Sequence, residues 1–175
     1  MIVFLSGYPA AGKSHVVREI VEKLPFETTV IDPKTFRPDD YDKLDEAAKR
    51  DLNVSVWEVS LDVLSEQIKG TSDSTIIFYD TACANLQKMR PLFELAAAQG
   101  HHVVYLFVVS TLEKCKERIG DKWLAEDVID RYTKNFKENI NVFKALASKT
   151  LIVRNEADVV PDVQPVVDYI KNYYG

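Results

Sequence analysis

GYPAAGKS, residues 7–14, decides the fold of this chain, because it matches the pattern GxxxxGK[ST] at every fixed position. Residues 1–5 before it are MIVFL, an apolar run that predicts a buried parallel strand. After it, apolar residues recur at helical spacing between His15 and Leu24. A strand, a glycine-containing loop and a helix in this order direct backbone N–H groups and the positive end of a helix dipole at one point. The stretch therefore predicts a loop that binds a polyphosphate.

The residue types within this loop indicate how the phosphates are held. Lys13 is expected to reach the β and γ phosphates of a nucleotide, and the hydroxyl of Ser14 is expected to bind Mg²⁺. The complete set of loop residues predicted to contact ATP is Gly7, Ala10, Ala11, Gly12, Lys13, Ser14 and His15.

The composition is that of one globular domain, which we expect to span residues 1–175. No stretch approaches the roughly 18 apolar residues of a membrane span, so no membrane partner is expected. The N-terminus already reads as a strand, which argues against a cleavable signal. Cys83 and Cys115 show no metal spacing, which favours a cytoplasmic location. A net charge of −5 argues against a protein that coats duplex DNA, but a local basic cleft could still grip one nucleotide.

Strand and helix patterns alternate along the rest of the chain. This alternation predicts an α/β fold with a five-stranded parallel sheet and helices on both faces. Further strands are predicted at 28–31, 75–79, 102–109 and 151–153. Helices are predicted at 43–69 (one helix or a pair), 86–99, from a capping box at residues 110–113, at about 125–147 and at 162–173.

Polar residues follow three of the predicted strands. Asp32 ends the second strand, Asp80 the third and Ser110 the fourth. Ligands of open parallel sheets bind at the carboxyl ends of the strands. We therefore expect these residues to meet the phosphate-binding loop at one rim of the sheet.

The sequence narrows the kind of phosphate chemistry. An Asn-Lys-x-Asp segment, typical of GTPase switches, is absent from the sequence, and a motor ATPase would usually be longer. A small kinase instead needs a mobile lid with basic residues that closes over the phosphates. Arg118, Lys122 and Arg131 lie where such a lid belongs, at about residues 114–127 and just beyond, although a solvated basic helix face would show the same pattern.

Several segments together resemble one kinase group. They are GYPAAGKS, residues 31–37 (IDPKTFR), residues 76–82 (IIFYDTA), the following helix with Gly100, residues 115–118 (CKER) and residues 124–129 (LAEDVI). Over nearly its whole length the chain resembles the polynucleotide 5′-kinases and their relatives among the zeta-toxin and small-molecule P-loop kinases. The resemblance implies a three-layer P-loop kinase fold with strand order 2-3-1-4-5 and a small helical lid. It also implies transfer of the γ-phosphate of ATP onto a hydroxyl with Mg²⁺.

The resemblance also implies roles for individual residues. Arg37 would position the acceptor, and Asp80 would face both the acceptor and the metal. Arg118 would be the first lid arginine, and Lys122 would lie near the second. Arg154 and Asn155 would lie beside the adenine of ATP. The predicted catalytic residues are Lys13, Asp32, Asp80 and Arg118; the metal ligands are Ser14 and Asp80; the substrate-binding residues are Asp32, Lys34, Arg37, Asp80, Thr81 and Arg90.

One position departs from the family pattern. The general-base aspartate usually stands three residues before the arginine, and here Lys34 occupies that place. Three explanations remain open: Asp32 serves as base, Asp80 or Asp39 takes the role, or Lys34 contacts a phosphate of the substrate. We favour Asp32, although a turn or helix cap would also explain an aspartate there.

Three acceptors are compatible with these residues. The first is a nucleic-acid hydroxyl, either a 5′-OH end or a hydroxymethyl group of a modified base on a single strand or a flipped nucleotide. The second is a nucleotide sugar or small metabolite, as in zeta-toxin-like kinases. The third alternative is a nucleotide-binding regulatory module without transfer. Candidate phosphate contacts are Lys34, Arg37, Lys88 and Arg90, and candidate stacking residues are Phe36, Tyr41 and Trp57, of which Trp57 is favoured as core.

Overall fold

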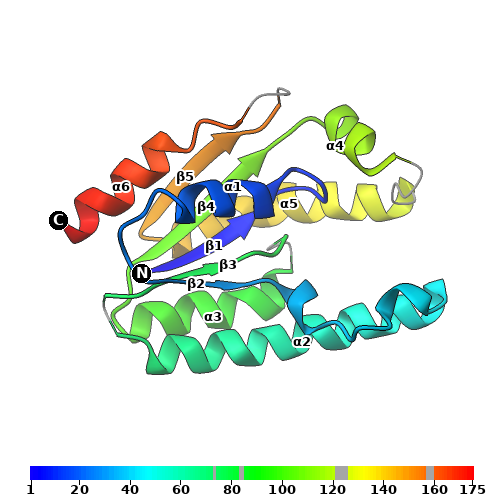
Figure 1. Cartoon of the computed structure of the whole chain (residues 1–175), viewed down its shortest axis with the longest axis horizontal. Coiled ribbons are helices and arrows are strands. Elements are labelled where there is room, and N and C mark those ends of the chain that lie inside the picture. Colours follow the sequence, from blue (N-terminus) through cyan, green and yellow to red (C-terminus); the bar gives the residue numbers. More distant parts are fainter. Residues whose placement is uncertain (73, 83–84, 121–125, 157–159) are drawn as a thin grey trace.

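Five parallel strands form the centre of the protein (Figure 1). The computed structural model describes residues 1–72, 74–82, 85–120, 126–156 and 160–175. The strands are β1 (Ile2–Ser6), β2 (Thr28–Ile31), β3 (Ile76–Tyr79), β4 (Val103–Val109) and β5 (Lys149–Arg154). The helices are α1 (Lys13–Val21), α2 (Glu46–Gly70), α3 (Leu86–Ala98), α4 (Leu112–Ile119), α5 (Glu126–Leu146) and α6 (Gln164–Tyr174), with short 3-10 helices η1 (Pro33–Phe36) and η2 (Tyr41–Lys43).

The strand order is β2-β3-β1-β4-β5, and all four neighbouring pairs are parallel. The first strand is therefore central, with Val3 opposite Phe78 of β3 and Val104 of β4. This arrangement confirms the predicted α/β fold and its order 2-3-1-4-5.

Alternation along β1 divides the core into two layers, one on each face of the sheet. Val3 and Leu5 pack with α1 and α6, and Ile2 and Phe4 pack with α2, α3 and α5. The rings of Phe4 and Phe93 stack with centroids 3.9 Å apart. Figure 1 shows the same layering, with α1 and α6 on one side of the sheet and α2 and α3 on the other. Both faces are covered, which explains why β1 is apolar throughout.

Two helix starts differ from the sequence prediction. The predicted helix at 43–69 is η2 followed by α2, because Asp45 accepts a hydrogen bond from Ala48 N (2.8 Å) and caps α2 there. The capping box was predicted to start at Ser110, but Thr111 is the N-cap of α4. The hydroxyl of Ser110 is buried and instead donates to the backbone oxygen of Asn155 (3.0 Å). A long-range bond thus decides the cap position.

The predicted lid lies partly outside the described residues. Its first part, residues 114–119, is the end of α4, and Lys122 falls in the stretch that is not described. Within the part of the chain that the structure describes, no helix combines the length and the apolar character that crossing a membrane requires.

Candidate nucleotide and acceptor site

The loop after β1 has the backbone conformation that its glycines permit. Gly7 and Gly12 have φ angles of 145° and 88°, and Ala10 also has a positive φ of 59°. At Gly7 a Cβ atom would lie 2.5 Å from the backbone oxygen of Val108, so a side chain cannot be placed there. The loop therefore packs directly on the end of β4.

Asn155 supports this loop from beneath. Its side chain is buried, and its Nδ2 donates a hydrogen bond to the backbone oxygen of Ala11 (2.8 Å). A Cβ atom at Gly12 would overlap the same amide, so the glycine is required for this approach. The sequence predicted that Asn155 lies beside the adenine of ATP, and that contact stays a prediction. Its support of the loop was missed, because the two partners are 144 residues apart.

Lys13 is held by the loop in which it lies. Its Nζ donates to the backbone oxygens of Gly7 (3.1 Å) and Tyr8 (3.0 Å). Burial lowers the pKa of Lys13 to about 8, although the nearby carboxylate of Asp80 acts in the opposite direction. A polyphosphate would give this ammonium the anionic partner that the carbonyl groups do not supply.

Asp80 and Ser14 are suited to a magnesium ion. Asp80 is only 6% exposed at the end of β3, and burial raises the pKa of its carboxyl. A hydrogen bond from the hydroxyl of Ser14 and the charge of Lys13 partly offset this effect. A carboxylate and a hydroxyl are oxygen ligands of the kind Mg²⁺ takes beside phosphates. Within the described segments, no group of three or more His, Cys, Asp or Glu residues is placed to hold a metal ion without other ligands. Mg²⁺ at Asp80 and Ser14 would take its remaining ligands from phosphates and water.

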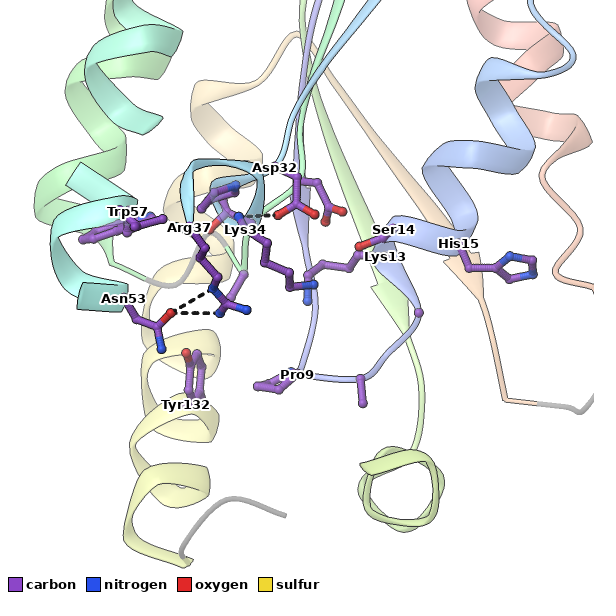
Figure 2. Close-up of a pocket in the computed structure, with 17 residues that line it drawn as sticks. Pro9, Lys13, Ser14, His15, Asp32, Lys34, Arg37, Asn53, Trp57 and Tyr132 are labelled. Atoms are coloured by element: carbon purple, nitrogen blue, oxygen red, sulfur yellow. Dashed lines mark hydrogen bonds between the residues drawn. The ribbon is translucent and has the colours of Figure 1, made fainter. Parts of the chain in front are cut away.

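A cleft of about 470 Å³ connects the loop with the ends of β2 and β3 and with α2 and α5 (Figure 2). Most of the predicted site residues meet in this cleft, as their places after the strands indicated. They are Ala10, Gly12, Lys13, Ser14, His15, Asp32, Lys34, Arg37, Asp80 and Thr81. The sequence did not predict Asn53, Val56 or Tyr132 in this wall, and it favoured a core position for Trp57. Trp57 lines the cleft, and it also packs against the core layer that contains α2 and α3.

Asp32, between β2 and η1, and Lys34, within η1, line one rim of the cleft. The Oδ1 of Asp32 accepts a hydrogen bond from Lys34 N (2.9 Å), so the aspartate caps η1 while it lines the cleft. The side chain of Lys34 extends toward Lys13 (Figure 2). Its charge adds to the lowering of the Lys13 pKa by burial, and it opposes the rise that burial causes in the pKa of Asp80. Lys34 therefore brings a second cation to the end of the phosphate-binding loop.

Three predicted arginines lie outside the cleft wall. Arg90 is exposed on α3 and lies 3.8 Å from Glu94, and Arg154 lies 3.5 Å from Glu156. Arg118 packs behind the loop, where it donates to the backbone oxygens of Ala10 (3.3 Å) and Asn155 (2.9 Å). In this arrangement Arg118 braces the loop and does not line the cleft.

A loop of this kind after the first strand of a 2-3-1-4-5 parallel sheet defines a nucleotide-binding protein with the P-loop kinase fold. The comparison with protein families agrees: the model of AAA_33, described as an AAA domain, matches residues 2–146, and the chain belongs to this family. The predicted resemblance to the P-loop kinases is thereby confirmed. No curated protein is significantly similar to the chain in sequence.

Solved structures share the fold at low sequence identity. Kti12 of Chaetomium thermophilum, in complex with ADP-AlF3, has a TM-score of 0.66 and 14% identity, with 98% of each chain covered. Shikimate kinase of Acinetobacter baumannii, in complex with shikimate, has a TM-score of 0.57 and 16% identity, with 99% of this chain and 92% of that chain covered. A protein of the PezAT toxin-antitoxin system of Streptococcus pneumoniae has a TM-score of 0.58 and 16% identity, with 89% and 68% covered.

Proposed function

We propose that the protein transfers the γ-phosphoryl group of ATP to a hydroxyl of a nucleic acid, either a 5′-OH end or the hydroxymethyl group of a modified base. The observation that carries the proposal is the cleft itself. One end is the phosphate-binding loop with Lys13, and the other end is a separate wall with Lys34, Arg37 and Trp57. A nucleotide-binding switch has no need of this second wall, whereas a phosphotransferase needs it for the acceptor.

Different residues of the cleft have different roles in an in-line phosphoryl transfer. The loop N–H groups and Lys13 bind the β and γ phosphates and stabilise charge that develops on the transferred group. Ser14 and Asp80 would hold Mg²⁺, which neutralises the phosphate oxygens when bound. The acceptor oxygen forms a bond to the γ-phosphorus while the bond to the leaving ADP oxygen breaks. Asp32 accepts the proton that the hydroxyl loses.

The aromatic and cationic wall supports a nucleic-acid acceptor. Trp57 from α2 and Tyr132 from α5 both line the cleft, and bases stack on aromatic rings of this kind. Lys34 and Arg37 lie at the same wall and supply positive charge within a chain whose net charge is −5. Local positive charge combined with ring surfaces suits a single strand or an extruded nucleotide better than a duplex surface.

A transfer screen tests the proposal. The protein is incubated with γ-labelled ATP, Mg²⁺ and three acceptors: an oligonucleotide with a 5′-OH, one with hydroxymethylated bases, and a nucleotide sugar. We expect label on a nucleic acid, a rate that falls with salt, and no label with Lys13→Ala. Label on the nucleotide sugar alone would refute the nucleic-acid acceptor. ATP binding without any labelled product would instead favour a regulatory module.

The role of Asp32 has its own test. Asp32→Asn keeps an oxygen that can accept the bond from Lys34 N, so η1 stays capped, but it cannot take a proton. We expect kcat to fall by about 10²-fold or more with little change in ATP affinity. An unchanged kcat would show that positioning alone suffices and that Asp32 is only a cap.

A further inference from the structure

Tyr8, the second residue of the phosphate-binding loop, is bonded to a helix far along the chain. Its hydroxyl donates a hydrogen bond to Oγ1 of Thr133 in α5 (3.0 Å), across 125 residues. The ring of Tyr8 also meets the ring of Phe136, about one turn further along α5, in a T-shaped contact with centroids 5.0 Å apart. One polar and one aromatic contact thus hold Tyr8 on α5.

The α5 side of this contact is itself fixed on the sheet. Phe136 is only 5% exposed, and the centroid of its ring lies 6.1 Å from that of Phe107 in β4. The ring of Phe136 also stacks on Tyr132, which lines the cleft (Figure 2). Tyr8 is therefore attached, through α5, to the same sheet from which the loop arises.

The backbone of Tyr8 connects this contact to Lys13. The backbone oxygen of Tyr8 accepts hydrogen bonds from Nζ of Lys13 (3.0 Å) and from Ala11 N (3.1 Å). Asn155 supports the loop at Ala11, whereas α5 supports it at Tyr8. The side chain of Tyr8 thus binds α5, and its carbonyl group holds both the turn of the loop and the lysine.

Support at Tyr8 should matter for nucleotides that carry β and γ phosphates. A loop that is already in place loses less conformational entropy on binding, which raises its affinity for a ligand. Lys13 is the group expected to reach the β and γ phosphates, so an error in its position should weaken ligands that have these phosphates. AMP lacks both, and its binding should depend little on where Lys13 lies.

We infer that Thr133 is a positioning residue of the nucleotide site: it holds the hydroxyl of Tyr8 and so fixes the carbonyl group against which Lys13 is placed. Thr133 does not line the cleft itself and acts only through Tyr8. The inference rests on the nucleotide binding in the proposed function and is independent of the acceptor. It gives α5 a second role in the site, beside the contribution of Tyr132 to the cleft wall.

Calorimetric titration with AMP-PNP, ADP and AMP in the presence of Mg²⁺ tests this role. Thr133→Val keeps the shape of the side chain and removes the oxygen that accepts from Tyr8. We expect AMP-PNP and ADP to bind about three- to tenfold more weakly than to the wild type, which is the effect of one hydrogen bond. AMP should bind as it does to the wild type. Equal weakening of all three nucleotides would show a merely structural effect on the loop and would overturn the inference.

Further variants check that the lost hydrogen bond causes the change. Tyr8→Phe removes the hydroxyl from the other side and should weaken AMP-PNP binding by a similar factor. The double variant Tyr8→Phe/Thr133→Val should bind no more weakly than either single variant, and losses that multiply would refute the coupling. Thr133→Ser retains an oxygen at this place and should restore wild-type affinity. Tyr173→Phe, at an exposed tyrosine of α6, is the matched control and should bind AMP-PNP like the wild type.

The outcomes separate this inference from the proposed function, because none of the measurements requires transfer to an acceptor. Wild-type affinity for AMP-PNP and ADP in Thr133→Val would refute the inference alone. Wild-type protein that binds no nucleotide would refute both. Differential scanning fluorimetry shows whether each variant is folded. If Thr133→Val does not fold, Tyr8→Phe decides the question, since Thr133 then keeps a hydroxyl that can bond within its own helix.

Discussion

Asn155→Ala should weaken the phosphate-binding loop, because it removes a buried hydrogen bond that supports the loop. The substitution removes the bond from Nδ2 to the oxygen of Ala11, in a side chain that is 6% exposed. Leaving a buried carbonyl without its partner costs about 1–3 kcal/mol. For a domain of this size, about 2 kcal/mol corresponds to a fall in Tm of roughly 4–8 °C.

The same substitution should lower ATP affinity, because the binding-competent loop becomes a smaller fraction of the population. A tenfold fall in that fraction weakens ATP binding tenfold, which corresponds to about 1.4 kcal/mol of binding free energy. Differential scanning fluorimetry and calorimetric titration with Mg²⁺ and AMP-PNP measure the two effects. Glu156→Gln, at the exposed next position, is the control and should change neither quantity. An Asn155→Ala protein with the Tm and ATP affinity of the wild type would refute the idea that Asn155 supports the loop.

Three further predictions concern charges and caps. Burial lowers the pKa of Lys13 to about 8, and bound phosphates favour its charged form. More protons should therefore be taken up on ATP binding at pH 8.5 than at pH 7. Calorimetry in two buffers of different ionisation enthalpy measures this proton uptake. Burial raises the pKa of the Asp80 carboxyl in the folded protein above its value in the unfolded chain, so folding stability falls as pH rises through the folded-state pKa. Asp80→Asn should therefore raise the Tm of the nucleotide-free protein near pH 7 and give no gain below about pH 4, where the carboxyl is protonated in both states. The same substitution should lower Mg²⁺-dependent transfer. Asp45→Ala removes the cap of α2 and should cost about 1 kcal/mol, seen as a fall in Tm, while ATP affinity stays unchanged.

The local sequence determined the elements and the phosphate-binding loop. The apolar run of β1, the glycines at 7 and 12, and the helix after them are neighbours in the chain, so their spacing is sufficient to predict strand, loop and helix. The aspartates at the ends of β2 and β3 were placed correctly at the cleft, because parallel strands bring their carboxyl ends to one edge.

Only the tertiary structure decided what surrounds these residues. Asn53 and Tyr132 come from α2 and α5, and no spacing in the sequence relates either helix to Arg37. Arg118 and Asn155 brace the loop through bonds that span 108 and 144 residues. Such contacts depend on how helices pack across a sheet, which a local pattern does not encode. The local sequence thus specifies the phosphate-binding loop, whereas tertiary packing determines which residues of α2 and α5 line the cleft opposite it.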